Sequence, residues 1–193
     1  MMNKIIEISV RESIAVKQAL LADEALLQGI ESLAQHLIRS FRQGGKVLFC
    51  GNGGSAADAQ HIAAELSGRF YTDRPPLFAE ALHVNTSYLT AVANDYGYEQ
   101  VFSRMVQAAG RPGDILVAIS TSGNSESILR ATAMAHQQGM LVAGLTGASG
   151  GRLASTCDVL LNVPSADTPR IQEAHILIGH ILCAMVEAAL FPK

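Results

Sequence analysis

The pattern of apolar and polar positions divides the chain into short apolar runs and longer segments of helical periodicity. Five runs of strand length are expected, at 46–50, 77–83, 115–119, 140–145 and 159–163. Between them, apolar residues recur every three or four positions, which predicts helices. The expected helices cover 56–68, 88–93, 99–109, 125–138 and 168–190, after two further helices within 3–43. Strands that alternate with helices indicate a parallel sheet covered on both faces.

This pattern predicts one α/β domain over residues 1–193. We expect a doubly wound, flavodoxin-like sheet of five parallel strands within 45–166. Residues 1–44 are expected to add a helical hairpin, and 167–193 a terminal helix. We find no internal linker and no low-complexity segment.

Composition adds a prediction about assembly. Apolar residues make up 49% of the chain and charged residues only 16%, against roughly 25% charged in an average soluble domain. A disordered chain is therefore excluded. So few charges favour burial of part of the surface against another copy of the chain, although Ala, Ser and Gln could also cover a monomer.

Charge and cysteine usage narrow the function classes. The net charge is −3 and no basic run is present, so a nucleic-acid partner is not expected. No apolar run approaches the roughly 18 residues of a membrane span. A signal peptide needs an uninterrupted apolar stretch near the N-terminus, but here Lys4, Glu7 and Arg11 break the apolar residues up. The three cysteines form no CxxC pair. We therefore expect no membrane contact, no disulfides and a cytoplasmic location.

Two loops follow predicted strands and open predicted helices. Ligands of parallel sheets bind at this edge. The first loop, 50–55, contains Asn52, Gly53 and Gly54, which allow close backbone approach, but it matches neither GxGxxG nor a P-loop. The second loop, 120–125, supplies four hydroxyls beside a helix N-terminus. Hydroxyls and free helix amides are donors for a phosphate, so the pair of loops predicts a phosphate site.

Titratable residues on two helices indicate a second site. His61 and Glu65 lie four residues apart on one helix face. Gln172 and His180 share a broad face of the last predicted helix. If the two helices face each other, the four side chains form a site for zinc or a similar divalent metal. A lone helical histidine is more often structural, and that interpretation is kept for the remaining histidines.

The motifs together resemble the phosphoheptose isomerases, the sedoheptulose-7-phosphate isomerases of the sugar-isomerase (SIS) superfamily. The resemblance spans nearly the whole chain. It rests on Cys50–His61 with Glu65, on Ala93–Gly97, on Ile119–Ser125, on Arg170–Glu173 and on His180. It implies a single SIS-type domain.

The resemblance also implies a reaction and its residues. Enzymes of this family convert D-sedoheptulose 7-phosphate to D-glycero-D-manno-heptose 7-phosphate, the start of heptose supply for lipopolysaccharide core or capsule. By position, Glu65 and His180 match the acid–base pair. The residues that match substrate contacts are Asn52, Gly53, Gly54, Glu65, Asn94, Asp95, Ser120, Thr121, Ser122, Ser125 and Gln172.

Zinc and a homotetramer are implied as well. His61, Glu65, Gln172 and His180 match the ligands of one zinc ion per subunit. A side chain bound to zinc cannot at the same time be a free base, and the sequence leaves open which role holds during turnover. The implied tetramer has active sites at subunit contacts. Some members carry Asp where this chain has Pro169, so a role for that acid is not carried over.

Three other functions share the fold. One bacterial relative binds the replication initiator, but it is degraded at the glycine loop and at the position of Glu65, both of which this chain keeps. A sugar-phosphate-sensing module normally accompanies a DNA-binding domain, for which the chain has no basic segment. An isomerase of ribulose or arabinose phosphates is disfavoured through the resemblance alone, by the terminal helix with Gln172 and His180.

Overall fold

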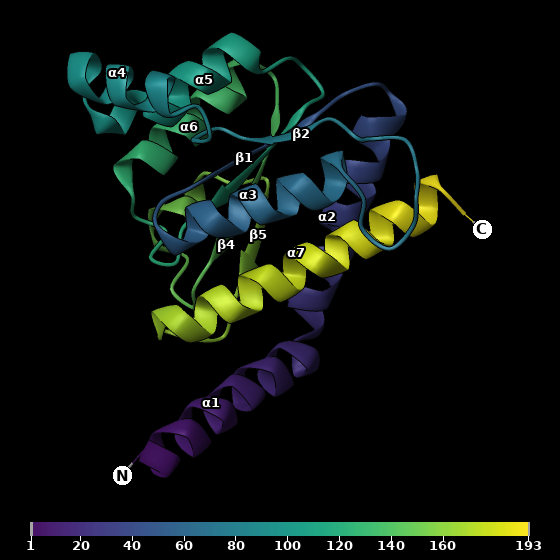
Figure 1. Ribbon diagram of the computed structural model, residues 1–193, viewed down its shortest axis with the longest axis vertical. Helices are drawn as coiled ribbons and strands as arrows, with labels where there is room; N and C mark the ends of the chain where they lie inside the picture. Colours follow the sequence, from purple (N-terminus) through teal and green to yellow (C-terminus); the bar gives the residue numbers. More distant parts are fainter. Residues whose placement is uncertain (1, 193) are drawn as a thin grey trace.

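A five-stranded parallel sheet forms the centre of the computed structural model, which describes residues 2–192 (Figure 1). Its order is β2-β1-β3-β4-β5. The strands are β2 (Ala79–Ala81), β1 (Val47–Gly51), β3 (Ile115–Ile119), β4 (Leu141–Thr146) and β5 (Val159–Asn162). Phe49 pairs with Val117, and Val117 pairs with Ala143. The predicted doubly wound sheet is confirmed, and its order reverses between β1 and β3, which is where such sheets bind ligands.

Each central strand contributes to two apolar cores. Val47 and Phe49 face one core, while Leu48 and Cys50 face the other. Every residue of β1 and β3 is buried. Continuous burial explains why these strands are unbroken apolar runs in the sequence, as is typical of parallel sheets covered on both faces.

Six α-helices cover the two faces (Figure 1). The first core holds α2 (Glu24–Arg42), α3 (Gly54–Ser67) and α7 (Thr168–Leu190), and the second holds α4 (Thr86–Tyr96), α5 (Val101–Ala109) and α6 (Glu126–Gln137). α7 is long and apolar enough to cross a membrane. It packs on α2 and α3 and buries Ile171, Ile178 and Leu182, so packing within the fold accounts for its apolar character.

The two predicted N-terminal helices are present, but they do not fold back on each other as a hairpin. α1 (Met2–Ala22) extends away from the body instead of folding back along α2 (Figure 1). The chain bends at Asp23, whose carboxylate accepts the amide hydrogen of Leu26 at 3.0 Å and begins α2. Leu20 is the one buried residue of α1 among those described. α1 contacts the start of α7, where Arg170 donates to the carbonyl of Ser9 and Lys17 pairs with Glu173. Most of its apolar stripe nevertheless stays exposed in the single chain, namely Ile5, Ile6, Ile8, Val10 and Ile14.

The other differences between the predicted and the observed secondary structure concern mainly where helices and strands begin and end. α4 begins at Thr86 because the Asn85 side chain caps it, accepting the amide hydrogen of Tyr88 at 3.0 Å. β2 has three residues instead of the expected seven. The first residues of the helix expected over 99–109 belong instead to a short 3₁₀ helix, Tyr98–Gln100, and α5 begins at Val101. A second 3₁₀ helix, Gly151–Ser155, lies where no helix was expected.

Candidate functional site

The two predicted ligand loops meet at the carboxyl edge of the sheet, beside the order reversal. A cavity of ≈ 150 Å³ lies between them. Its walls come from both loops and from the end of β3: Asn52, Ser55, Ile119, Ser120, Thr121, Ser122 and Ser125. The structure thus brings the four predicted phosphate-binding hydroxyls and Asn52 to one cavity.

The start of α6 has donors that its own cap does not use. Ser125 occupies the N-cap position, but its hydroxyl makes no capping bond among the described residues. Its Oγ lies 3.4 Å from Oγ of Ser120, a long contact. The first amides of a helix carry positive partial charge and lack helical partners. This arrangement can hold a small anion.

Close backbone contact fixes the hydroxyl loop on its neighbour. Gly123 has φ +67°, and a Cβ there would stand 2.0 Å from the carbonyl oxygen of Gly150. The Asn124 side chain accepts the amide hydrogen of Arg152 at 3.0 Å and donates to the carbonyl of Ser122 at 2.9 Å. The loop therefore packs directly on the segment that starts the Gly151–Ser155 turn.

Arg152, the nearby cation, is paired with an acid. Its Nη1 lies 3.1 Å from Oε2 of Glu126, and Nε of Arg130 donates to Oε1 at 3.0 Å. These hydrogen bonds, from Arg130 first and then Arg152, lower the pKa of Glu126. The cavity therefore depends on hydroxyls and helix amides, not on a free guanidinium.

Asn52 has two partners that the sequence did not suggest. Tyr98 donates its hydroxyl hydrogen to Oδ1 of Asn52 at 2.7 Å, and Asn52 donates from Nδ2 to Oγ of Ser127 at 3.1 Å. Asn94 and Asp95 are exposed at the end of α4, hydrogen-bonded to each other at 2.8 Å. They lie in the sequence just before Tyr98, but no contact in the described chain joins them to the cavity.

α3 and α7 lie side by side and place three predicted metal ligands together. Nε2 of His61 is 3.1 Å from Oε1 of Glu65 and 3.4 Å from Nε2 of His180. One ligand atom from each residue falls within 4.8 Å of the others, close enough to hold a metal ion. We call these three residues the His–Glu–His cluster. Gly179 permits the approach, since a Cβ there would meet Ile62 at 2.2 Å.

Gln172, the fourth predicted ligand, lies elsewhere. Its side chain packs over Gly54 at the start of α3, within 2.3 Å of where a Cβ would be. His180 is eight residues further along α7, about 12 Å at helical rise. The structure therefore brings three of the four together within one chain, while Gln172 lies at the start of α3, next to the loop that lines the cavity.

Two neighbours affect the His–Glu–His cluster. Phe70 stacks on His180, with ring centroids 5.7 Å apart and planes at 26°. Asp58, one turn before His61 on α3, has an Oδ2 buried without a partner among the described residues. Burial raises its pKa to about 6, and His61 partly opposes that rise.

Comparison with known proteins places the chain in a family. The model of the SIS domain matches residues 12–147. The phosphoheptose isomerase of Aneurinibacillus thermoaerophilus is 55% identical over 98% of this chain and 96% of its own. That of Mycobacterium tuberculosis is 57% identical over 93% of this chain and 92% of its own. The chain belongs to the phosphoheptose isomerases.

Solved structures agree. The phosphoheptose isomerase of Neisseria gonorrhoeae has a TM-score of 0.92 and 44% identity, covering 97% of this chain and all of that one. The enzyme of Francisella tularensis has the same TM-score at 41% identity, covering 96% of this chain and 98% of that one. The predicted family, fold and isomerase class are confirmed.

Proposed function

We propose that this isomerase interconverts D-sedoheptulose 7-phosphate and D-glycero-D-manno-heptose 7-phosphate, in the cytoplasm, for the supply of a surface glycan. The observation that carries the proposal is the convergence of a carboxylate and two imidazoles in the His–Glu–His cluster, in a chain 55% identical to a phosphoheptose isomerase. Ketose–aldose conversion moves a proton between C1 and C2 and a second between their oxygens. Such groups suit both transfers.

Glu65 and His180 are the proposed acid–base residues. Glu65 takes the proton from one carbon and returns it to the next, because a carboxylate at this point reaches both. His180 moves the proton between the two oxygens, a task for which an imidazole is suited near neutral pH. Nε2 of His61 lies within 3.4 Å of both side chains and holds them at a common point.

The same cluster is the proposed site of one zinc ion per subunit, with ligand exchange during turnover that releases Glu65 and His180 from the metal for proton transfer. Two imidazole nitrogens and a carboxylate oxygen are ligands that zinc prefers, and the three donors fall within 4.8 Å of one another. When bound, the metal polarises the carbonyl and stabilises negative charge on oxygen. Gln172 is the proposed fourth ligand. Metal analysis of protein purified without chelator should find zinc, and His61→Ala should lose it.

Substrate phosphate is proposed to bind in the ≈ 150 Å³ cavity. Ser120, Thr121, Ser122 and Ser125 would donate hydroxyl hydrogens, assisted by the first amides of α6. Asn52, Gly53, Gly54, Asn94 and Asp95 are proposed sugar contacts. Thr121→Val should weaken substrate binding more than it lowers the melting temperature.

The proposed site is shared between subunits. Ser55 lines the phosphate cavity, and Glu65 follows it ten residues later in α3, about 15 Å along the axis. An extended sedoheptulose 7-phosphate spans roughly 10 Å from phosphorus to C1, since its bonds are about 1.5 Å long. The phosphate cavity of one chain is therefore proposed to serve the His–Glu–His cluster of another, which also gives Gln172 of one copy access to the cluster of its neighbour.

The exposed stripe of α1 supports the homotetramer that this sharing requires. Large apolar residues on it are left in water by the single chain, namely Ile5, Ile6, Ile8, Val10 and Ile14. Helices packed across two-fold axes give a dimer of dimers. Light scattering should report about four copies, and Ile6→Glu with Val10→Glu should reduce both assembly and turnover.

The decisive test is turnover itself. Wild-type protein incubated with sedoheptulose 7-phosphate should give the aldose by NMR without nucleotide or redox cofactor. Glu65→Gln keeps the side-chain shape and removes the base, so turnover should fall by roughly 10²–10⁴-fold. Near-normal turnover by Glu65→Gln would refute the assigned role, and a wild-type chain without turnover would refute the reaction.

A further inference from the structure

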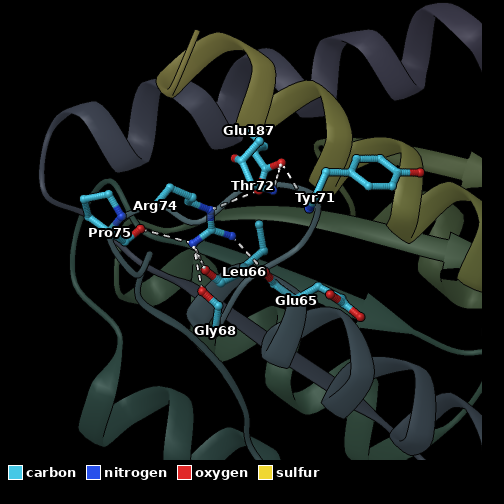
Figure 2. A network of polar contacts seen from close by, with 8 residues as sticks. All are labelled: Glu65, Leu66, Gly68, Tyr71, Thr72, Arg74, Pro75 and Glu187. Atoms are coloured by element: carbon cyan, nitrogen blue, oxygen red, sulfur yellow. Dashed lines mark hydrogen bonds and ion pairs between the residues drawn. The ribbon is translucent and has the colours of Figure 1, made fainter. Parts of the chain in front are cut away.

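A buried ion pair lies behind the His–Glu–His cluster. Arg74, in the loop after α3, and Glu187, near the end of α7, have side chains only 2% and 6% exposed. Nε of Arg74 donates to Oε2 of Glu187 at 3.3 Å. Figure 2 shows the pair at the centre of a network that joins the end of α3, the loop and α7.

Arg74 holds the last turn of α3. Its Nη2 donates to the carbonyl oxygen of Glu65 at 2.8 Å, and its Nη1 donates to the carbonyl of Leu66 at 2.7 Å (Figure 2). The last carbonyls of a helix lack helical partners, and a cation there opposes the negative end of the helix dipole. The guanidinium therefore keeps in helical form the turn from which the Glu65 side chain projects to His61.

Glu187 holds the neighbouring loop. Its Oε1 accepts the amide hydrogens of Tyr71 and Thr72, at 3.1 and 3.0 Å (Figure 2). Phe70, which comes directly before them, stacks on His180. The carboxylate thus fixes the segment that packs one face of the His180 ring.

We infer that Arg74 and Glu187 are positioning residues for the isomerisation, setting the placement of Glu65 and His180 from behind the cluster. The inference rests on the proposed roles of those two residues. The pair touches none of the cluster's ligand atoms: Arg74 acts through the Glu65 backbone and Glu187 through the loop that carries Phe70. Partners in this outer position commonly change metal affinity or activity by 10–100-fold when they are replaced.

Arg74→Lys is the primary variant, because it keeps the charge beside Glu187. An ammonium lacks the planar fork that reaches the carbonyls of Glu65 and Leu66 together. We expect kcat to fall about tenfold, with KM changed less than twofold. Co²⁺ affinity of the cluster, followed by the visible absorption of the bound ion, should fall by a similar factor.

Two further variants separate positioning from folding. Arg74→Met with Glu187→Gln removes both charges, so that neither is left buried alone. Lys46→Met is the matched control: it breaks another buried pair, Lys46–Asp114, which lies at the amino ends of β1 and β3 and shares no hydrogen bond with Arg74 or Glu187. The control should lower the unfolding midpoint while kcat and Co²⁺ affinity, measured well below that midpoint, stay at wild-type values.

The outcomes are distinct. A loss of kcat and Co²⁺ affinity in Arg74→Lys or in the folded double variant, with Lys46→Met unaffected, supports the inference. Wild-type kcat and Co²⁺ affinity in both Arg74 variants would overturn it, since the pair would then serve stability alone. A wild-type protein that neither isomerises the sugar phosphate nor binds Co²⁺ would refute the proposed function instead. If Arg74→Met does not fold, Arg74→Lys and Glu187→Gln carry the same comparison.

Discussion

The side-chain amide of Gln172 lies directly over Gly54, so that a Cβ on Gly54 would meet Nε2 at 2.3 Å and Oε1 at 2.9 Å. This contact joins the start of α3 to the first turns of α7. It places an amide beside the glycine loop that borders the phosphate cavity. A hydrogen atom at position 54 is what allows Gln172 to occupy this place.

Gly54→Ala should displace Gln172 without unfolding the protein. The obstructing atoms are the far end of a flexible side chain, which can move, whereas displaced site residues can cost about 10²-fold in rate. Steady-state kinetics should show that loss, with an unchanged circular dichroism spectrum. Gln172→Ala is the companion: the double variant should be no slower than Gln172→Ala alone, because both changes remove one contact. Additive losses would contradict this explanation.

Gly123→Ala should disrupt the hydroxyl loop 120–125, which lines the cavity. The residue has φ +67°, and its neighbour at 2.0 Å is the Gly150 backbone, which cannot rotate away. Gly113→Ala is the control, since Gly113 also has a positive φ, +88°, but has open space around it. The control should cost about 1 kcal/mol of unfolding free energy, and Gly123→Ala more than 2 kcal/mol. Urea unfolding measures both, and only Gly123→Ala should lose stabilisation by added phosphate.

Two impaired variants should complement each other when they are combined and assayed at low substrate concentration. Glu65→Gln removes the base and leaves the phosphate cavity intact, while Thr121→Val impairs the cavity and leaves the base. If each site takes its cavity from one chain and its cluster from another, roughly a quarter of sites regain both by random pairing in a symmetric oligomer. Co-expressed, doubly tagged enzyme should therefore turn over faster than either parent. No gain would place both halves of the site in one chain.

The buried His175 should make the protein acid-sensitive. Burial lowers its pKa from 6.5 to about 4, and its Nε2 lies 3.2 Å from the carbonyl oxygen of Thr146. Because the unfolded state then binds the extra proton, stability is full above pH 6.5 and falls as the pH drops toward 4. The loss reaches about 3 kcal/mol in unfolding free energy.

The variant His175→Gln tests whether His175 causes the acid sensitivity. Glutamine keeps an N–H donor for the carbonyl oxygen of Thr146 but has no group that binds a proton in this pH range. Urea unfolding at pH 7 and pH 4.5 should show a smaller difference for the variant than for the wild type. Asp58 titrates in the opposite sense, because its pKa of about 6 exceeds the usual 3.8. Its effect is common to both proteins and cancels in the comparison. Equal differences would exclude His175 as the source.

Local sequence features predicted the strands, the two ligand loops and most helices. Buried parallel strands are unbroken apolar runs, and glycines with hydroxyls mark the loops that follow β1 and β3. The start of α4 was missed although Asn85 and Thr86 carry a capping signal. The antiparallel packing expected of the two N-terminal helices does not form, because the apolar stripe of α1 shows that the helix can bury a face but does not say against which element.

The site was predicted in its residue types more than in its geometry. His61, Glu65 and His180 meet as expected, because one helical turn separates the first two. Helical angle alone placed Gln172 on a shared face, but its eight-residue offset from His180 separates the two along the axis. Tyr98 bonds to Asn52, 46 residues away in the sequence, and Arg74 pairs with Glu187, 113 residues away. Periodicity reports only neighbours within one helix or strand, so it could not predict these contacts.

The position of α7 along the chain has a consequence for synthesis on the ribosome. The phosphate cavity is built from segments that end with Ser125, whereas the His–Glu–His cluster needs His180. Because α7 follows all five strands, a growing chain can form the cavity at the carboxyl edge of the sheet while the surface of α3 that receives α7 still faces water. That surface includes Ile62 and Leu66, both buried in the finished fold, so a stalled chain presents an apolar face for chaperones to bind. The His–Glu–His cluster is therefore completed only when α7, which also closes the core, has been synthesised.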